Sequence, residues 1–183
     1  MKKVRVLLAA LLSVTVVLGT AVPTYAAEPV SNVLIEVNAT DMNVSVTVPS
    51  TLPIVFNADG TNTFPDNWTI ENVSALAGIH LKQIDLHADG TGWKLVNDSE
   101  TVRTQVANGK AIKFFAGVEG NMQLVEPDNG SESENGTATF GVSDICIASG
   151  QTKDINFSVE RGAFTQTTVS AKAFTMELGF EFN

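Results

Sequence analysis

The sequence predicts an all-β protein, an antiparallel two-sheet β-sandwich of about nine or ten strands, and three observations support this fold class. Apolar and polar residues alternate with a period of two, most clearly in residues 174–182, as in strands with one buried and one wet face. Asp-Gly and Asn-Gly pairs, which favour the positive φ of tight hairpins, recur between such segments. No stretch of about twelve residues has a convincing helical period.

The expected strands follow this alternation in chain order. They cover residues 33–39, 44–48, 53–56, 68–74, 79–87, 92–96, 110–116, 122–125, 137–147, 155–159 and 174–182. The apolar phase of the clearest strands assigns these side chains to the core: Val44, Val46, Val48, Ile155, Phe157, Val159, Phe174, Met176, Leu178 and Phe180.

Two of the expected strands change phase midway. In residues 79–87 the apolar positions pass from Ile79 and Leu81 to Ile84 and Leu86, and residues 137–147 show a similar change. Since side chains alternate strictly along a regular strand, each change predicts a bulge or a crossing between sheets.

Turn signals separate the strands. Residues 126–136 are polar, acidic and rich in glycine, so we expect a solvated loop between strands there. Tight turns are expected at Asp59-Gly60, Asp89-Gly90, Asn108-Gly109, Asn129-Gly130 and Asn135-Gly136.

The first 26 residues predict export. Lys2, Lys3 and Arg5 precede a nearly unbroken apolar run, and Ala26 closes a small-residue cleavage site. We therefore expect a signal peptide over residues 1–26 and a single β-sandwich domain over residues 27–183. The apolar run is shorter than the roughly 20 residues that span a bilayer, so no stable membrane anchor is expected.

The excess of acidic residues argues against two classes of binding partner. After residue 26 the chain holds eight Lys and Arg against twenty Asp and Glu, a net charge of −12. Such a surface repels nucleic acid and anionic lipid, both of which bind through clusters of basic residues. Solubility in a salty extracellular medium explains the acidic composition. The alternative interpretation is that some of the carboxylates bind calcium. Ala-Asp-Gly-Thr occurs twice, but without the ligand spacing of an EF-hand calcium loop, and hairpin turns explain both copies.

No catalytic pattern stands out. Cys146, the single cysteine, lies among apolar residues and is expected to be a small buried side chain. His80 and His87 lie seven residues apart in one expected strand, too far apart for one metal ion, and are expected on the surface. We therefore predict no enzymatic activity, no metal site and no cofactor. The absence of paired cysteines, together with the Lys-Lys type of leader, indicates a bacterial exported protein.

Two tryptophans are the candidate ligand contacts. Trp68 and Trp93 have the ring size to form a stacking platform for sugars, or else they pack in the core. The single tyrosine, Tyr25, belongs to the predicted leader, so no tyrosine assists such a platform.

The order of motifs from Val44 to Val96 resembles a known group of proteins. The segment 46–60 reads VTVPSTLPIVFNADG, and Ile70-Glu71-Asn72-Val73-Ser74 and Gly92-Trp93-Lys94-Leu95-Val96 follow it. This resembles small secreted β-sandwich proteins of Gram-positive, often clostridial, bacteria, most of them without an assigned function. The resemblance implies a secreted, cell-surface or extracellular location.

Trp93-Lys94-Leu95 also resembles the first Trp-x-Leu motif of bacterial surface domains that bind the cell wall non-covalently. Those domains carry a second Trp-x-Leu near the C-terminus, where this chain reads Met176-Glu177-Leu178. The partial resemblance implies peptidoglycan as a second class of ligand.

Two hypotheses of function follow from these features. The first is a secreted, non-enzymatic cell-surface or extracellular-matrix protein that acts through its surfaces or strand edges and can assemble with itself. Under it, residues 33–39 and 172–182 are the strands expected to associate at an exposed edge. The alternative is a carbohydrate- or peptidoglycan-binding module with Trp68 and Trp93 as contacts.

Overall fold

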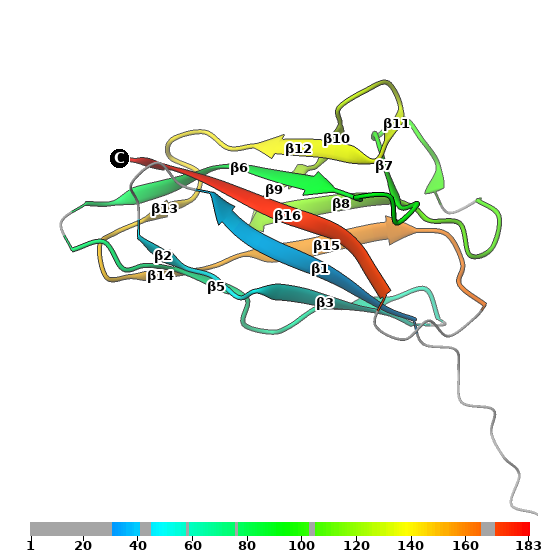
Figure 1. The fold of residues 1–183 in the computed structure, drawn as a ribbon, viewed down its shortest axis with the longest axis horizontal. Helices are drawn as coiled ribbons and strands as arrows, with labels where there is room; N and C mark the ends of the chain where they lie inside the picture. Colours follow the sequence, from blue (N-terminus) through cyan, green and yellow to red (C-terminus); the bar gives the residue numbers. More distant parts are fainter. Residues whose placement is uncertain (1–30, 41–44, 58, 76, 103–104, 166–170) are drawn as a thin grey trace, which may run out of the picture.

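The structure, a computed structural model, is all-β, as the sequence predicts. It describes residues 31–40, 45–57, 59–75, 77–102, 105–165 and 171–183 (Figure 1). The strands in these residues are β1 (Ser31–Thr40), β2 (Val46–Thr47), β3 (Thr51–Phe56), β4 (Asn62–Thr63), β5 (Thr69–Asn72), β6 (Ile79–His87), β7 (Lys94–Val96), β8 (Ala111–Val118), β9 (Asn121–Leu124), β10 (Glu126–Pro127), β11 (Glu132–Ser133), β12 (Asn135–Thr139), β13 (Cys146–Ile147), β14 (Thr152–Asp154), β15 (Asn156–Arg161) and β16 (Ala171–Phe182).

The larger sheet holds most of the long strands. Its hydrogen-bonded order is β10-β12-β6-β16-β1-β3-β4, and β13 pairs with the beginning of β6. Figure 1 shows β1 and β16 side by side in the middle of this sheet. These two strands run parallel, as do β7 and β8, and the other described pairs are antiparallel as predicted.

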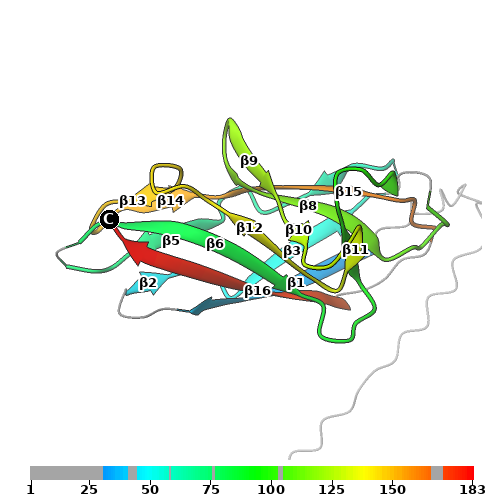
Figure 2. The ribbon, with the colours of Figure 1, turned by 90° about the horizontal axis from the view of Figure 1, so that it is seen from above.

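The second layer is built from two smaller sheets. One has the order β11-β7-β8-β15, with β9 paired to the end of β8, and the other has the order β14-β5-β2. Only Ile155 separates β14 from β15, and its N–H donates to the carbonyl of Trp68 (3.0 Å), so the two sheets continue one another. Figure 2 shows β8 and β15 of this layer lying over β16 and β1 of the larger sheet, which confirms the sandwich.

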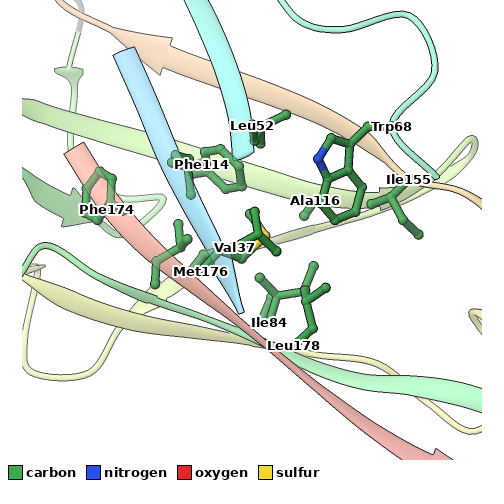
Figure 3. Packing of buried hydrophobic residues seen from close by; sticks show 14 of the residues in the cluster. Val37, Leu52, Trp68, Ile84, Phe114, Ala116, Ile155, Phe174, Met176 and Leu178 are labelled. Atoms are coloured by element: carbon green, nitrogen blue, oxygen red, sulfur yellow. The ribbon is translucent and has the colours of Figure 1, made fainter. Parts of the chain in front are cut away.

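The core fills the space between the layers. Met176 and Leu178 of β16 lie in one cluster with Val37 of β1 and Phe114 of β8 (Figure 3). Burying one such side chain contributes about 1.5–3 kcal/mol, so the alternating pattern that predicts these strands also stabilises their packing. The core predictions are confirmed for Ile155, Val159, Phe174, Met176, Leu178 and Phe180; Val46, Val48 and Phe157 are partly buried against the core, and Val44 lies outside the described residues.

The predicted phase change in residues 79–87 is a bulge. Against β6, the register of β16 passes from Gly179 opposite Gln83 to Phe180 opposite Leu81, so Lys82 is the extra residue. The bulge keeps both halves of β6 facing the core. The phase change in residues 137–147 is instead a turn between β12 and β13, in which the backbone N–H of Gly141 donates to the carboxylate of Asp144 (2.6 Å).

Residues 126–136 depart from the prediction. They contain the short strands β10 and β11 and the first two residues of β12, rather than one continuous loop. Asn135-Gly136 therefore lies in a strand, and Gly136 is needed there because a Cβ would approach the carbonyl oxygen of Glu126 to 2.5 Å. The predicted turn geometry is found at Asp89 and Asn108, whose φ angles are 48° and 66°.

Candidate interaction sites

The two terminal strands do not lie where the edge-association hypothesis places them. Residues 33–39 belong to β1, which lies between β3 and β16, and residues 172–182 belong to β16, which lies between β1 and β6. Both strands are interior, so the prediction that they form exposed edges is wrong. The alternating pattern identifies a strand with one wet face, but it carries no information about the strand's neighbours within the sheet.

β1 is fixed in the sheet by hydrogen bonds and by packing. It pairs with β3 from Ser31 to Glu36 and with β16 from Val33 to Thr40. Its inward side chains, Val33, Ile35 and Val37, are at most 5% exposed. The first described strand of the chain thus completes the middle of the larger sheet.

A charged pair on the outer face marks the register of β1 against β16. Lys172 of β16 donates to the carboxylate of Glu36 on β1 (2.7 Å) and lies 3.7 Å from Asp89. The hydrogen bond to Glu36 raises the pKa of the Lys172 ammonium, while desolvation opposes the shift. Because both side chains are exposed, the pair contributes more to register than to stability.

The strands at the ends of the two larger sheets are mostly short. β4, β10 and β11, at the ends of the two larger sheets, are two residues long each. β15 is the long edge strand, and its Val159 carbonyl accepts a hydrogen bond from the amide nitrogen of Asn62 (2.7 Å). Short strands and side chains that occupy edge groups are the usual protection against uncontrolled strand addition.

Arg161 fastens the β3–β4 connection to the end of β15. Its guanidinium donates to the carbonyls of Asn57 (2.7 Å) and Thr61 (3.0 Å), to the side chain of Asn62 (2.8 Å) and to the carbonyl of Gly162 (3.0 Å). It is 7% exposed and lies over the ring of Phe56, 4.7 Å from its centroid. Burial lowers the pKa of Arg161, and the Asp59 carboxylate opposes this effect.

Trp93 is a core residue. It is 4% exposed and packs against Phe56, Phe164 and Phe174 with ring centroids 6.0–6.3 Å apart. Leu95 is fully buried beside it, so the Trp-x-Leu motif packs its two apolar residues into the sandwich and exposes Lys94, which pairs with Glu132. The Trp93 ring also lines a pocket of about 230 Å³ with Lys110 and Lys172.

Trp68 is also buried, with 3% of its surface exposed. Its indole N–H donates to the carbonyl of Thr51 (3.3 Å), and its ring meets Phe157 edge-on at 5.1 Å. It forms part of the wall of a pocket of about 360 Å³, which the more accessible Phe64, Asp66, Asp154 and Asn156 also line. A second pocket of about 430 Å³ shares Asp154 and Asn156 and extends to Glu119 and Lys153.

The two tryptophans are therefore not brought together into one platform. A sugar stacks on an exposed ring face, and neither tryptophan presents one in this structure. The polar groups at the Trp68 pocket carry no sequence signal, because Asp154 and Asn156 come from strands β14 and β15 whereas Asp66 comes from the segment before β5.

The histidine and cysteine predictions are partly wrong. Cys146 is exposed and donates to the carbonyl of Val142 (2.9 Å), while His80, opposite it on β6, is 3% exposed and bonds to the side chain of Asn183 (3.0 Å). His80 also lies 3.8 Å from Glu181. In the part of the chain that the structure describes, no three His, Cys, Asp or Glu side chains converge as metal ligands would.

The two Ala-Asp-Gly-Thr copies use their carboxylates within the protein. Asp59 accepts hydrogen bonds from the backbone N–H (2.8 Å) and hydroxyl (2.6 Å) of Thr61, which lower the pKa of its carboxyl. Asp89 accepts from the hydroxyl of Thr175 (2.6 Å). The first copy turns between the antiparallel strands β3 and β4, as the hairpin interpretation predicts. The second copy connects β6 to β7, which belong to different sheets, so the hairpin interpretation is wrong there, and Asp89 instead ties this turn to β16.

Comparison with known proteins adds no relative: no family model matches the chain, and neither curated proteins nor solved structures contain a match. Among the described residues there is also no helix of the length and hydrophobicity needed to cross a bilayer.

Proposed function

We propose that this chain is an exported, non-enzymatic protein of the bacterial cell surface or extracellular matrix, and that it acts by associating with other copies of itself. The leader-like first 26 residues and the acidic composition support export into a salty medium. Residues 44–96 resemble secreted proteins of Gram-positive bacteria, which supports a location at the cell surface or outside the cell.

One observation carries the self-association part of the proposal. The first described strand, β1, lies in the middle of the larger sheet between β3, which follows it closely in the chain, and β16, which comes from the far end of the chain. A strand placed in this way can be supplied by its own chain or by another chain with the same contacts. Structural surface proteins use such strand complementation to link subunits without a separate adhesive surface.

Size-exclusion chromatography with light scattering tests this function. The protein is secreted from a Gram-positive host that expresses the full chain and is then run across a concentration series, with and without calcium. We expect the mean mass to rise with concentration. A constant monomer mass at the highest concentration, under both conditions, would refute the proposal.

A second function, binding of a neutral glycan or of peptidoglycan, is favoured by the paired pockets beside Trp68. The pocket that Trp68 lines combines aromatic side chains, Phe64 and Phe157, with the carboxylates and amide of Asp66, Asp154 and Asn156. Aromatic surface next to a few convergent polar groups is the usual composition of a sugar site. The two pockets meet at Asp154 and Asn156, which suits an extended polymer better than a single sugar.

Retention on insoluble peptidoglycan tests this second function. Trp68→Ala would open the core, so the exposed Asp154→Asn variant is the better probe. Retention is expected to fall several-fold in this variant and to persist in Asp128→Asn, a matched change outside the pockets. Equal retention of both variants would contradict glycan binding at this site.

A further inference from the structure

We propose that β1 is the exchanged element: β1 of one copy takes the place of β1 between β3 and β16 of another copy. This inference rests on the proposed function and specifies its contact. The partner is a second copy of this chain. A strand that replaces β1 must place apolar side chains at the same alternate positions and pair in the same register, and β1 of another copy does both.

The position of β1 in the sheet has to be occupied by a strand. Without β1, the paired edges of β3 and β16 would face each other across a gap, with their backbone groups unpaired. The same removal would uncover buried side chains on both neighbours, including Leu52 and Ile54 of β3 and Met176 of β16. A copy whose β1 has moved away is therefore stable only when another β1 replaces it.

A connection of five residues follows β1 in the sequence. Residues 41–45 join it to β2, and its sheet neighbours reach it only through hydrogen bonds and packing. If residues 1–26 are removed on export, four residues precede it. An exchanged β1 makes the same contacts as before, so only the path of the connecting residues and the protein concentration decide between the two arrangements.

Simple addition at an outer edge would use strands that are shorter than β1. The edge strands β4, β10 and β11 offer two residues each, and Asn62 occupies an edge carbonyl of β15. β1 offers ten residues, of which the described side chains alternate between buried and accessible. The pairing of Glu36 with Lys172 selects the register, and it is available equally from the partner's β1.

Glu36 and Thr51 provide a disulfide trap for exchange. They face each other across β1 and β3, and both are exposed. The neighbouring N–H of Val37 donates to the carbonyl of Ser50 (3.1 Å), so Glu36 and Thr51 form a non-hydrogen-bonded pair. The Cα atoms of such pairs are about 4.5 Å apart, which is within the range of a disulfide.

The trap uses two variants with one cysteine each. Glu36→Cys and Thr51→Cys, both in a Cys146→Ser background, are co-expressed from full chains with distinguishable tags and oxidised. A disulfide between two differently tagged chains, from Cys at position 36 of one to Cys at position 51 of the other, forms efficiently only where β1 of one copy lies beside β3 of the other. The control combines Glu36→Cys with Thr137→Cys, which lies on β12, beyond β16 and β6 in the same sheet.

We expect the mixed disulfide to be at least several-fold more abundant in the Glu36–Thr51 combination than in the control. Equal yields would overturn the exchange. Light scattering on the same proteins without oxidation separates the two proposals. Mass that grows with concentration while disulfide yields are equal leaves self-association standing and refutes β1 as its contact. A constant monomer mass with equal yields refutes both.

Discussion

At the scale of single residues, one buried side chain with four polar contacts in the described part of the chain is one that the sequence does not mark. Arg161 lies just beyond the predicted strand 155–159 and carries an ordinary charge, yet its guanidinium donates to four acceptors and thereby joins the connection between β3 and β4 to β15. Three of these acceptors belong to residues 99–104 positions away in the chain. Sequence periodicity cannot reveal such a contact, because it depends on how strands are placed after folding.

Arg161→Met tests this contact. The change keeps much of the apolar stem but removes the four charge-assisted hydrogen bonds of the guanidinium and its contact with the Phe56 ring, so we expect the free energy of unfolding to fall by about 2–4 kcal/mol. Urea denaturation measures the effect. Lys153→Met, which removes a cation from β14, is the matched control and should change the unfolding free energy by less than about 0.5 kcal/mol. Equal effects of the two changes would show that Arg161 is not a fastening residue.

Glu181 gives the protein a specific sensitivity to acid. Its hydrogen bond with Lys82 holds the pKa of its carboxyl below the ordinary value, although burial opposes the shift. A carboxyl whose pKa is lowered by folding stabilises the protein above its unfolded pKa of about 4.3, and this contribution is lost as the pH falls through the folded value.

Glu181→Gln should therefore flatten the loss of stability between about pH 5 and pH 3. Thermal unfolding at a series of pH values measures this slope. Glu177→Gln, on the same strand and face but without an ion pair among the described residues, should leave the slope closer to that of the wild type. A steeper slope for Glu181→Gln would contradict the pairing.

At the scale of elements, strong periodicity predicts strands well and their neighbours poorly. β6 has the predicted bounds, and the phase change within it is the predicted bulge. The short strands β4, β10, β11 and β14 escape prediction because two or three residues cannot show a period. The interior position of β1 and its parallel pairing with β16 depend on contacts between the two ends of the described chain, which no local pattern contains.

The two faces of β1 should differ sharply in their tolerance to change. Ile35 is fully buried whereas its neighbour Leu34 points to the outer face and is partly exposed. We expect Ile35→Ala to lower the free energy of unfolding by about 2–4 kcal/mol and Leu34→Ala by less than about 1 kcal/mol. Urea denaturation of both variants checks this order. The reverse order would place the wrong face of β1 against the core.

In the candidate site, the sequence predicts some of the residues and misses others. Trp68 and Trp93 are singled out by residue type, but their burial leaves only the pocket walls for a ligand. Asp154 and Asn156 are unremarkable in the sequence and become neighbours of Asp66 only after β14 and β15 fold against the segment before β5. A choice of ligand-contact residues by residue type alone therefore selects the large tryptophan rings and overlooks the accessible polar side chains.

At the scale of the whole molecule, charge opposes association and strand contacts favour it. The full chain has a formal net charge of −9, so two copies repel each other at low ionic strength. Raising the salt concentration from about 0.01 M to 0.15 M shortens the Debye length from about 30 Å to 8 Å and screens that repulsion. We expect the mean mass from light scattering to rise with salt at fixed protein concentration. A fall in mass with salt would indicate contacts between opposite charges instead.

The most direct test of the central claim is to lock β1 in its own chain. Glu36→Cys and Thr51→Cys are combined in one Cys146→Ser chain and oxidised at low concentration, where each β1 is linked to its own β3. Light scattering across a concentration series then compares this locked protein with the same protein after reduction. Exchange predicts that the reduced protein grows in mass and that the locked protein stays monomeric. Equal growth of both forms, or growth of neither, would contradict it.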